Sequence, residues 1–234
     1  MGIQYNPSII TDGLILCLDA GNKRSYPGAG SAWTDRSPNG NNGTLVNSPS
    51  FSADNGGGIV FDGTDDHVTT NLDASSFSST NTEFTVDIWM DPDANNSSFA
   101  LFNFNNGTGE YIEIRMNGTA YRITTRFNSI TDTASVVPFG GGSWTNLTCV
   151  KAAGVQDIYL NGSIAVVGSP NTAQGNDLDF GAGGGSVIGC RGTPSSPATT
   201  YWNGKISIVR VYNQAMSAKE IAQNYRATKG RYQL

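Results

Sequence analysis

Two groups of oxygen-bearing side chains lie close together in the first third of the sequence. They are Asp62, Asp65 and Asp66 in the turn FDGTDDH, and Asp35, Asn39 and Asn41 in the loop before it. Ca²⁺ takes about six to eight oxygen ligands, which aspartate, asparagine and backbone carbonyls in loops supply. We therefore expect these six residues as candidate ligands of a structural Ca²⁺. The alternative is that they are solvated turn residues.

Two pairs of carboxylates lie close enough in the sequence to be considered as the acid/base pair of a hydrolase. Asp87 and Asp91 share one face of a predicted strand, but four residues of strand separate them by roughly 13 Å. A glycosidase holds its two carboxyl groups about 5–9.5 Å apart. Glu110 and Glu113 differ by an odd number and fall on opposite faces of their strand. We interpret these carboxylates as solvated charges and predict that the chain is not an enzyme.

Histidine and cysteine are too scarce for most other site chemistry. His67 is the single histidine, so any Ser-His-Asp scheme would need it. A metal site of several histidines or paired cysteines is excluded by count. Cys17, Cys149 and Cys190 each lie in an apolar, strand-like stretch. Three buried small hydrophobic residues are favoured there over a disulfide and one free thiol.

Composition excludes several classes of partner. The formal net charge of −5, the pI near 4.7 and the absence of a Lys/Arg run argue against nucleic acid. The longest apolar run, residues 14–18, is far shorter than the roughly 18 residues that span a membrane. No basic segment followed by an apolar core opens the chain, so we expect no signal peptide and synthesis in a reducing cytoplasm.

The elements that must position these residues are mostly short strands. About twelve or more apolar, alternating segments follow one another at roughly ten-residue spacing, with turn signals between them. The pattern predicts an all-β antiparallel sandwich or jelly roll over residues 13–228, with residues 1–12 as an arm or edge. Three Asn-Gly pairs between strands predict type I′ hairpin turns, which begin at Asn106, Asn117 and Asn161.

A helix follows the last strand. Ser217 as N-cap and Glu220 three residues later form a capping box, which predicts a helix over residues 218–228 and a cap contribution of about 1 kcal/mol. Gly230 is the expected stop. Its apolar face is expected to pack on the sandwich, and the tail, residues 229–234, is a candidate contact between subunits. That face consists of Ile221, Ala222 and Tyr225.

A family resemblance rests on landmarks in a fixed order over residues 13–225. They are GLILCLDAGN, WTDRSPNGNNGTL, IVFDGTDDHV, EFTVDIWM, SWTNLTCV, DIYLNGSIAV, VIGC and YWNGKISIVRVYNQAMSAKEI. The set resembles the concanavalin A-like, laminin-G-like jelly-roll family. The resemblance implies two antiparallel sheets stacked face to face, with one short C-terminal helix packed at one end.

A narrower resemblance lies in the two ends of the chain. YNPSIITDGLILCLDAGNKRSYPG and EIAQNYRATKGRYQL are similar to stand-alone laminin-G-like proteins of tailed-bacteriophage virions. This implies a non-enzymatic protein of the virion surface, as a capsid decoration or small fibre component. Its implied partners are other virion proteins, in an oligomer or array, and host-surface glycans. A soluble carbohydrate-binding module is the alternative, and a glycoside hydrolase is disfavoured.

The family also suggests roles for single residues. Lectin-like sandwiches stack sugars on exposed aromatic rings, and the candidates in predicted loops are Tyr26, Trp33, Tyr201 and Trp202. Trp89 and Trp144 lie in strands and are expected in the core. Related sandwiches often hold Ca²⁺ with an aspartate near the start of the last strand, where this chain has Ser207. The family usually has an aromatic residue in place of His67, which implies a packing or hydrogen-bonding role for it.

Overall fold

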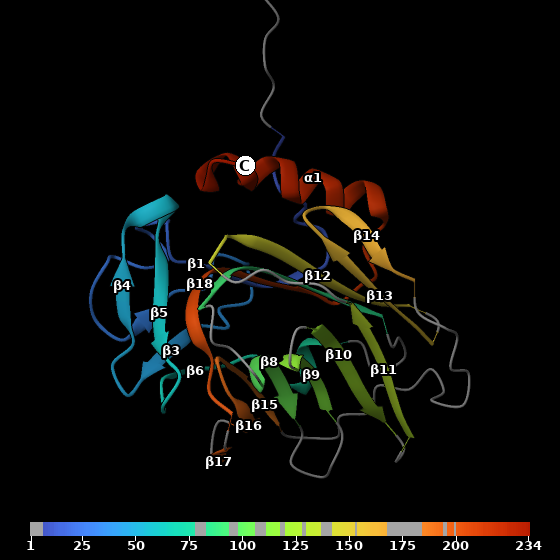
Figure 1. Cartoon of the computed structure of the whole chain (residues 1–234), viewed down its shortest axis with the longest axis horizontal. Coiled ribbons are helices and arrows are strands. Elements are labelled where there is room, and N and C mark those ends of the chain that lie inside the picture. Colours follow the sequence, from blue (N-terminus) through green and yellow to red (C-terminus); the bar gives the residue numbers. More distant parts are fainter. Residues whose placement is uncertain are drawn as a thin grey trace, which may run out of the picture.

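The computed structural model of the chain describes residues 7–77, 83–93, 98–105, 111–117, 120–127, 130–136, 142–152, 154–167, 184–193, 196–198 and 200–234. In these residues two antiparallel β-sheets lie face to face, and a single α-helix crosses the outer side of one sheet (Figure 1). The predicted all-β jelly-roll sandwich with one short C-terminal helix is confirmed.

Sheet A, the sheet beside the helix, has eight strands within the described residues. They are β1 (Leu14–Asp19), β4 (Ser50–Ser52), β5 (Gly58–Asp62), β7 (Phe84–Pro92), β12 (Thr145–Ala152), β13 (Val155–Leu160), β14 (Ser163–Val166) and β18 (Asn203–Tyr212). β18 lies at its centre. It pairs with β7 along one edge, and with β5 and then β1 along the other.

Sheet B also has eight strands in the part of the chain that is described. They are β2 (Ala32–Trp33), β3 (Gly43–Val46), β6 (His67–Thr70), β8 (Ser98–Asn105), β9 (Tyr111–Asn117), β10 (Ala120–Phe127), β11 (Ile130–Val136) and β15 (Gly185–Ile188). A separate hairpin joins β16 (Arg191–Thr193) to β17 (Ser196–Ala198). β2 and β4, the edge strands of the two sheets, lie on the same side of the sandwich.

The main core fills the space between the sheets. On β7 the predicted alternation holds, since Phe84, Val86 and Ile88 are fully buried in that core. Phe102 and Ile114 meet them from sheet B. Burial of such side chains, at about 25 cal/mol per Å² of apolar surface, is the main source of stability in a two-sheet fold.

The outer face of sheet A is buried as well, because the C-terminal segment lies across it (Figure 1). Trp89 and Ile208 project from that face and pack with Trp144 and Tyr232 in a second apolar cluster. Both faces of β7 are therefore covered, and every residue from position 84 to position 90 is buried. Trp89 and Trp144 are buried as predicted, although in this outer cluster and not between the sheets.

The predicted helix is present as α1 (Ala218–Thr228) with its capping box. Ser217 accepts from the Glu220 backbone N–H, and the Glu220 carboxylate accepts from the Ser217 N–H at 2.8 Å. The expected stop at Gly230 is wrong. The chain continues through it as a 3₁₀ helix, η4 (Lys229–Tyr232), and turns into the left-handed region only at Gln233.

The tail packs against its own chain. Tyr232 is 4% exposed and stacks on Trp89 with ring centroids 4.1 Å apart. Arg231 donates to both carboxylate oxygens of Asp19, at 2.7 and 2.8 Å. The end of the tail is exposed, with Leu234 at 49%, and is the part of the tail that is accessible to the predicted contact between subunits.

Residues 7–12 also pack on the chain itself. The Ile10 N–H donates to the Asn224 side chain at 2.8 Å, and the Tyr212 hydroxyl donates to the Ile10 carbonyl at 3.2 Å. Ile9 and Ile10 contact the apolar cluster beneath α1. These residues therefore form an ordered edge that joins the two ends of the described chain.

The remaining expectations concern turns and short elements. Asn161 and Gly162 both have positive φ, as a type I′ hairpin requires, and they join β13 to β14. The turns predicted at positions 106–107 and 117–118 lie outside the described residues in whole or part. Strands β2, β4, β11, β15, β16 and β17 and the short 3₁₀ turns η1 (Asp54–Gly56) and η2 (Ala74–Ser76) were not predicted. Among the described residues, no helix has the length and apolarity to cross a membrane.

Candidate ligand pocket

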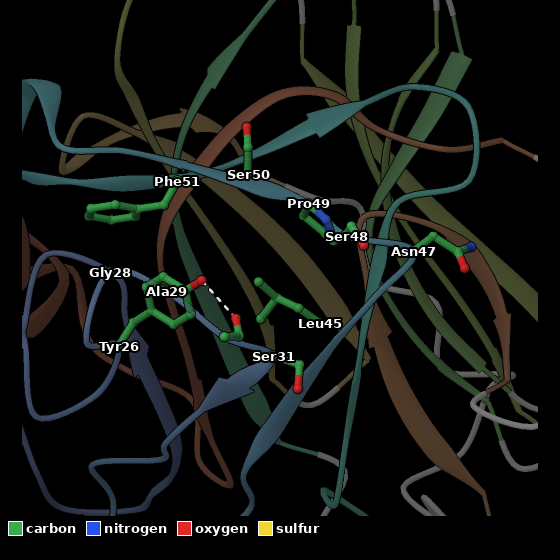
Figure 2. A pocket seen from close by; sticks show the side chains of 11 residues that line it. Tyr26, Gly28, Ala29, Ser31, Leu45, Asn47, Ser48, Pro49, Ser50 and Phe51 are labelled. Atoms are coloured by element: carbon green, nitrogen blue, oxygen red, sulfur yellow. Dashed lines mark hydrogen bonds between the residues drawn. The ribbon is translucent and has the colours of Figure 1, made fainter.

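A pocket of about 410 Å³ lies on the side of the sandwich that carries the edge strand β4. Its walls come from the loop before β2, from β3, and from the β3–β4 connection with β4 itself. The lining residues are Tyr26, Gly28, Ala29, Gly30, Ser31, Leu45, Asn47, Ser48, Pro49, Ser50 and Phe51. In Figure 2 Tyr26 and Phe51 lie at one end, Leu45 near the middle and Asn47 at the other end.

An aromatic pair closes one end of the pocket. The Tyr26 and Phe51 ring centroids lie 5.4 Å apart, tilted by 50°. The Tyr26 hydroxyl donates to the Gly30 carbonyl at 2.8 Å, the dashed line of Figure 2. Burial raises the pKa of Tyr26, so the phenol stays a neutral donor. This bond folds the Gly-rich loop back over its own tyrosine and fixes the shape of the pocket.

The opposite wall has an unusual backbone. Asn47 and Ser48 are consecutive non-glycine residues with φ of 68° and 76°. Such residues cost about 1–3 kcal/mol each and cluster at ligand sites. Ser48 also precedes Pro49, which restricts its backbone further. Asn47 is held in place by a bond from its side-chain amide to the Asp65 carbonyl, at 3.0 Å. The strained wall is therefore anchored to the neighbouring turn.

The chemistry of the lining is neutral. None of the lining residues carries a charge, and four of them, Tyr26, Ser31, Ser48 and Ser50, carry hydroxyls. An adjoining pocket of about 290 Å³ shares Tyr26, Gly28 and Phe51 and has Lys23 among its lining residues. The pair Tyr26–Phe51 thus borders both hollows. Tyr26 is itself only 3% exposed, so the accessible ring surface is that of the half-buried Phe51, beside several hydroxyl and backbone hydrogen-bonding groups.

The four aromatic residues predicted to contact glycans are not brought together. Trp33 and Trp202 are 0% exposed in the main core, so neither ring offers a face to a sugar, and this expectation is wrong for both. Tyr201 is half-buried and lies beside His67, with ring centroids 6.2 Å apart. Tyr26 alone lines the pocket. Sequence reasoning missed Phe51, an isolated aromatic residue in a polar stretch, because β4 was not predicted.

The structure brings together half of the expected calcium ligands. Asp62, Asp65 and Asp66, the acidic turn, have carboxylate oxygens within 4.8 Å of one another. Burial raises the pKa of Asp66, and the neighbouring carboxylates add to this effect. Asp66 accepts from the Asp62 N–H at 3.1 Å, and Asp62 accepts from the Thr64 N–H at 2.8 Å. This group has the donor chemistry of a cation site and also the internal bonds of an ordinary turn.

The other three expected ligands form hydrogen bonds within the fold. They are the loop group, Asp35, Asn39 and Asn41. The Asp35 carboxylate accepts from the backbone N–H groups of Cys17, Ser37 and Asn41, each at 2.8 Å. The Asn39 and Asn41 side chains donate to backbone carbonyls of β1. These polar groups fasten the loop to β1, so their side chains are already hydrogen-bonded.

The loop group and the acidic turn lie at opposite ends of the β3–β6 ladder. Gly43 pairs with Thr70 at the end that follows the loop group, and Val46 pairs with His67 at the end beside the acidic turn. Three residues of strand correspond to about 10 Å. The six residues therefore do not form one metal site, which corrects the expectation. Ser207 is buried and donates to the Gly57 carbonyl while it accepts from the Tyr232 hydroxyl.

The carboxylates tested for hydrolysis are ion-paired, and the prediction that they are solvated is wrong for two of them. Asp87 is 1% exposed and pairs with Arg210 at 2.7 Å beneath the C-terminal segment. Glu113 is 2% exposed and lies between Arg115 and Arg191. Asp91, which is partly exposed, pairs with Lys205 at 3.1 Å, and position 110 lies outside the described residues.

His67 and the cysteines have the structural roles expected of them. His67 is 3% exposed, and its Nδ1 lies 2.9 Å from the Asp65 carbonyl oxygen. The three cysteines are free and buried, so no disulfide links them. Burial raises the pKa of Cys190 to about 12, which keeps that thiol protonated at neutral pH.

Comparison with known proteins decides the family. The family model Laminin_G_3, described as the concanavalin A-like lectin/glucanases superfamily, matches residues 62–222, more than half of the chain. The chain belongs to this superfamily. No curated protein sequence matches it. The Laminin_G_3 match begins at Asp62, the last residue of β5, so the pocket beside Tyr26 lies outside the matched residues.

Solved structures share the concanavalin A-like fold at low identity. Domain 4 of AbnA, a GH43 extracellular arabinanase from Geobacillus stearothermophilus, in complex with arabinotriose, has a TM-score of 0.69 and 15% identity, with 92% of this chain and 100% of that chain covered. The botulinum neurotoxin serotype G binding domain has a TM-score of 0.69 and 15% identity, with coverage of 91% and 50%. The serotype D ligand binding domain in complex with N-acetylneuraminic acid has a TM-score of 0.69 and 14% identity, with coverage of 92% and 51%. The chain thus spans about half the length of the toxin domains that it matches.

Proposed function

We propose that the chain is a non-enzymatic carbohydrate-binding domain, and that its Tyr26–Phe51 pocket holds a neutral sugar. The observation that supports this proposal is the uncharged lining of the pocket, in which an aromatic pair lies beside serine hydroxyls and backbone groups. A sugar presents C–H faces to aromatic rings and hydroxyls to hydrogen-bonding groups. The volume of about 410 Å³ lies within the roughly 300–1,000 Å³ of small-molecule sites.

The ion pairing of the carboxylates that were tested for hydrolysis supports a binding role. Hydrolysis of a glycoside needs two carboxyl groups about 5–9.5 Å apart at the scissile bond. Asp87 and Glu113 are each held by arginine, and Asp91 by lysine. The residues that line the pocket include no carboxylate. Two of the similar structures are complexes with carbohydrates, which supports the same assignment.

A glycan array followed by calorimetry tests the proposal. The protein should bind at least one neutral glycan, and Phe51→Ala should weaken that binding by about tenfold or more, as expected when a stacking ring is lost. Phe51→Leu, which keeps apolar volume but removes the ring, should weaken binding while preserving the fold. Val167→Ala is the matched control, because Val167 is 72% exposed and does not line the pocket.

Two results would contradict the proposal. One is a wild-type protein that binds no glycan on the array, with and without Ca²⁺. The other is a Phe51→Leu variant that keeps both its melting temperature and its full affinity. If a chelator abolishes glycan binding while the Phe51 variants keep the affinity of the wild type, the ligand instead binds beside the acidic turn.

We also propose a setting for this domain, the surface of a tailed-phage virion, as a capsid decoration or small fibre component. This proposal is supported by the similarity of the sequence at both ends to stand-alone laminin-G-like virion proteins. In that setting the domain is synthesised in the host cytoplasm, is arrayed with other virion proteins and displays its pocket to host-surface glycans. Mass spectrometry of purified virions tests it. Absence of the protein from intact particles would refute it.

A further inference from the structure

The hollow that adjoins the Tyr26–Phe51 pocket, which we call the Lys23 hollow, has a volume of about 290 Å³. Lys23 and Ala53 line it, together with glycine backbone. The half-buried Phe51 lines both hollows and lies at the border between them. Their volumes are near the lower end of the roughly 300–1,000 Å³ of small-molecule sites. Two small hollows side by side suit a ligand of two linked units.

The floor of the Lys23 hollow is a contact between two backbone segments. Gly21 follows β1 and Gly57 precedes β5. A Cβ on Gly21 would lie 1.8 Å from the Gly56 carbonyl oxygen, and a Cβ on Gly57 would lie 2.9 Å from the Gly21 Cα. Gly57 also has a φ of 92°, which other residues rarely adopt. Because these positions carry no side chain, the space above the contact stays open beside Phe51.

Lys23 alone carries a charge among the residues that line the two hollows. It is exposed and forms no ion pair within the described residues. Arg24, the next residue, is exposed as well. Of the nearby carboxylates, Asp19 is paired with Arg231 at 2.7 Å, and Asp54 is exposed and lines neither hollow. The Lys23 hollow therefore offers positive charge to a ligand, whereas the Tyr26–Phe51 pocket offers none.

We propose that the ligand of this domain is an anionic oligosaccharide that occupies both hollows. A neutral sugar lies in the Tyr26–Phe51 pocket, and the next sugar places a carboxylate or sulfate group beside the Lys23 ammonium. The linkage between the two sugars crosses the Phe51 ring. This inference rests on the proposed glycan-binding function and adds the class of glycan to it.

The contribution of Lys23 follows from its exposure. An ion pair at an exposed position strengthens binding by about two- to fivefold and is weakened by salt, since the screening length falls from about 8 Å at 0.15 M to about 3 Å at 1 M. The lysine ammonium acts as a point charge and does not select between carboxylate and sulfate by shape. Both kinds of anionic sugar therefore belong in the test.

A glycan array that carries neutral oligosaccharides beside their uronic-acid and sulfated counterparts tests the proposal on the full chain. At 0.15 M salt, at least one anionic glycan should bind about two- to fivefold more tightly than its neutral counterpart. The advantage should disappear at 1 M salt, while the affinity for the neutral glycan should stay within about twofold of its value at 0.15 M. The uronic-acid and sulfated members show which anionic group is preferred.

Three variants locate the anionic group. Lys23→Gln should remove the advantage of the anionic glycan and leave binding of the neutral one within about twofold of the wild type, whereas Lys23→Arg should retain the advantage. Lys219→Gln is the matched control, because Lys219 is exposed on α1 and lines neither hollow.

A fourth variant tests the space itself. Ala53 lines only the Lys23 hollow and has a φ of −82° and a ψ of −6°, which leucine adopts without strain. Ala53→Leu should therefore narrow the hollow and weaken binding of the anionic oligosaccharide without a change in melting temperature.

The proposal is overturned by any of three results. These are equal affinities for neutral and anionic counterparts, equal binding of the anionic glycan by Lys23→Gln and Lys219→Gln, or full affinity in the Ala53→Leu variant. Each of them leaves the proposed function standing, provided that Phe51→Leu still weakens binding of the neutral glycan. If no glycan binds, or if Phe51→Leu keeps the full affinity, the glycan-binding function of the pocket is itself contradicted, and the two-site ligand with it.

Discussion

Replacement of Tyr232 by alanine should lower the free energy of unfolding by about 4 kcal/mol. The ring is 4% exposed and lies between Trp89 and Trp144, with centroids 4.1 and 4.8 Å away. Removal of a buried large aromatic side chain costs about 3–5 kcal/mol, of which each aromatic contact supplies about 0.5–1.5 kcal/mol. In a chain of this size the melting temperature should fall by about 8–16 °C.

Urea denaturation of two matched variants separates the parts of this effect. Tyr232→Phe keeps the ring and loses only the 2.8 Å hydrogen bond to Ser207, so it should cost about 1 kcal/mol. Leu234→Ala, at a position 49% exposed, should change little. If Tyr232→Ala costs less than about 1 kcal/mol, the tail is not docked in solution. The tail would then be free for the contact between subunits that its sequence suggested.

Other perturbations test the C-terminal segment and the charges beneath it. Ser217→Ala should cost about 1 kcal/mol in a urea titration, through the lost cap. Hydrogen bonds from Ser217 lower the pKa of Glu220, so its contribution is complete above its ordinary pKa of about 4.3 and is lost as the pH falls. Glu220→Gln should flatten the stability profile in that acid range. Asp87→Ala should destabilise by about 3–5 kcal/mol, because it leaves Arg210 buried and unpaired. Iodoacetamide should leave the buried thiols, Cys190 included, unmodified in the native protein and label them after unfolding, as mass spectrometry can show.

The sequence predicts the fold because its local signals agree with the global structure. The alternation in β7, the Asn161–Gly162 turn and the capping box at Ser217 each follow from short-range rules, and the structure contains all three. What the short-range rules miss is the covering of the outer face of sheet A. Alternation marks Asp87 as solvent-facing, but the C-terminal segment returns over it from more than 120 residues away in sequence.

The candidate site was predicted less well, for a related reason. Exposure of a loop aromatic depends on which segments fold over it, and Trp33 and Trp202 are both covered by the core. The three carboxylates of the acidic turn lie close together because they are close in the sequence. The distance between Asp35 and this turn depends instead on how β3 pairs with β6. No sequence pattern around Phe51 marked it as a site residue. Its place beside Tyr26 arises because the loop before β2 packs against β4.

The position of β18 has a consequence for the order in which the chain can fold. This strand is the last of the chain to be synthesised among those described, yet it lies at the centre of sheet A. Until residues 203–212 leave the ribosome, β7 and β5 each expose an unpaired edge, and β1 has no partner strand. Exposed edges of this kind favour pairing between chains. The nascent chain therefore remains open to misassembly until β18 has been made, and translation stalled before β18 should yield chains that aggregate.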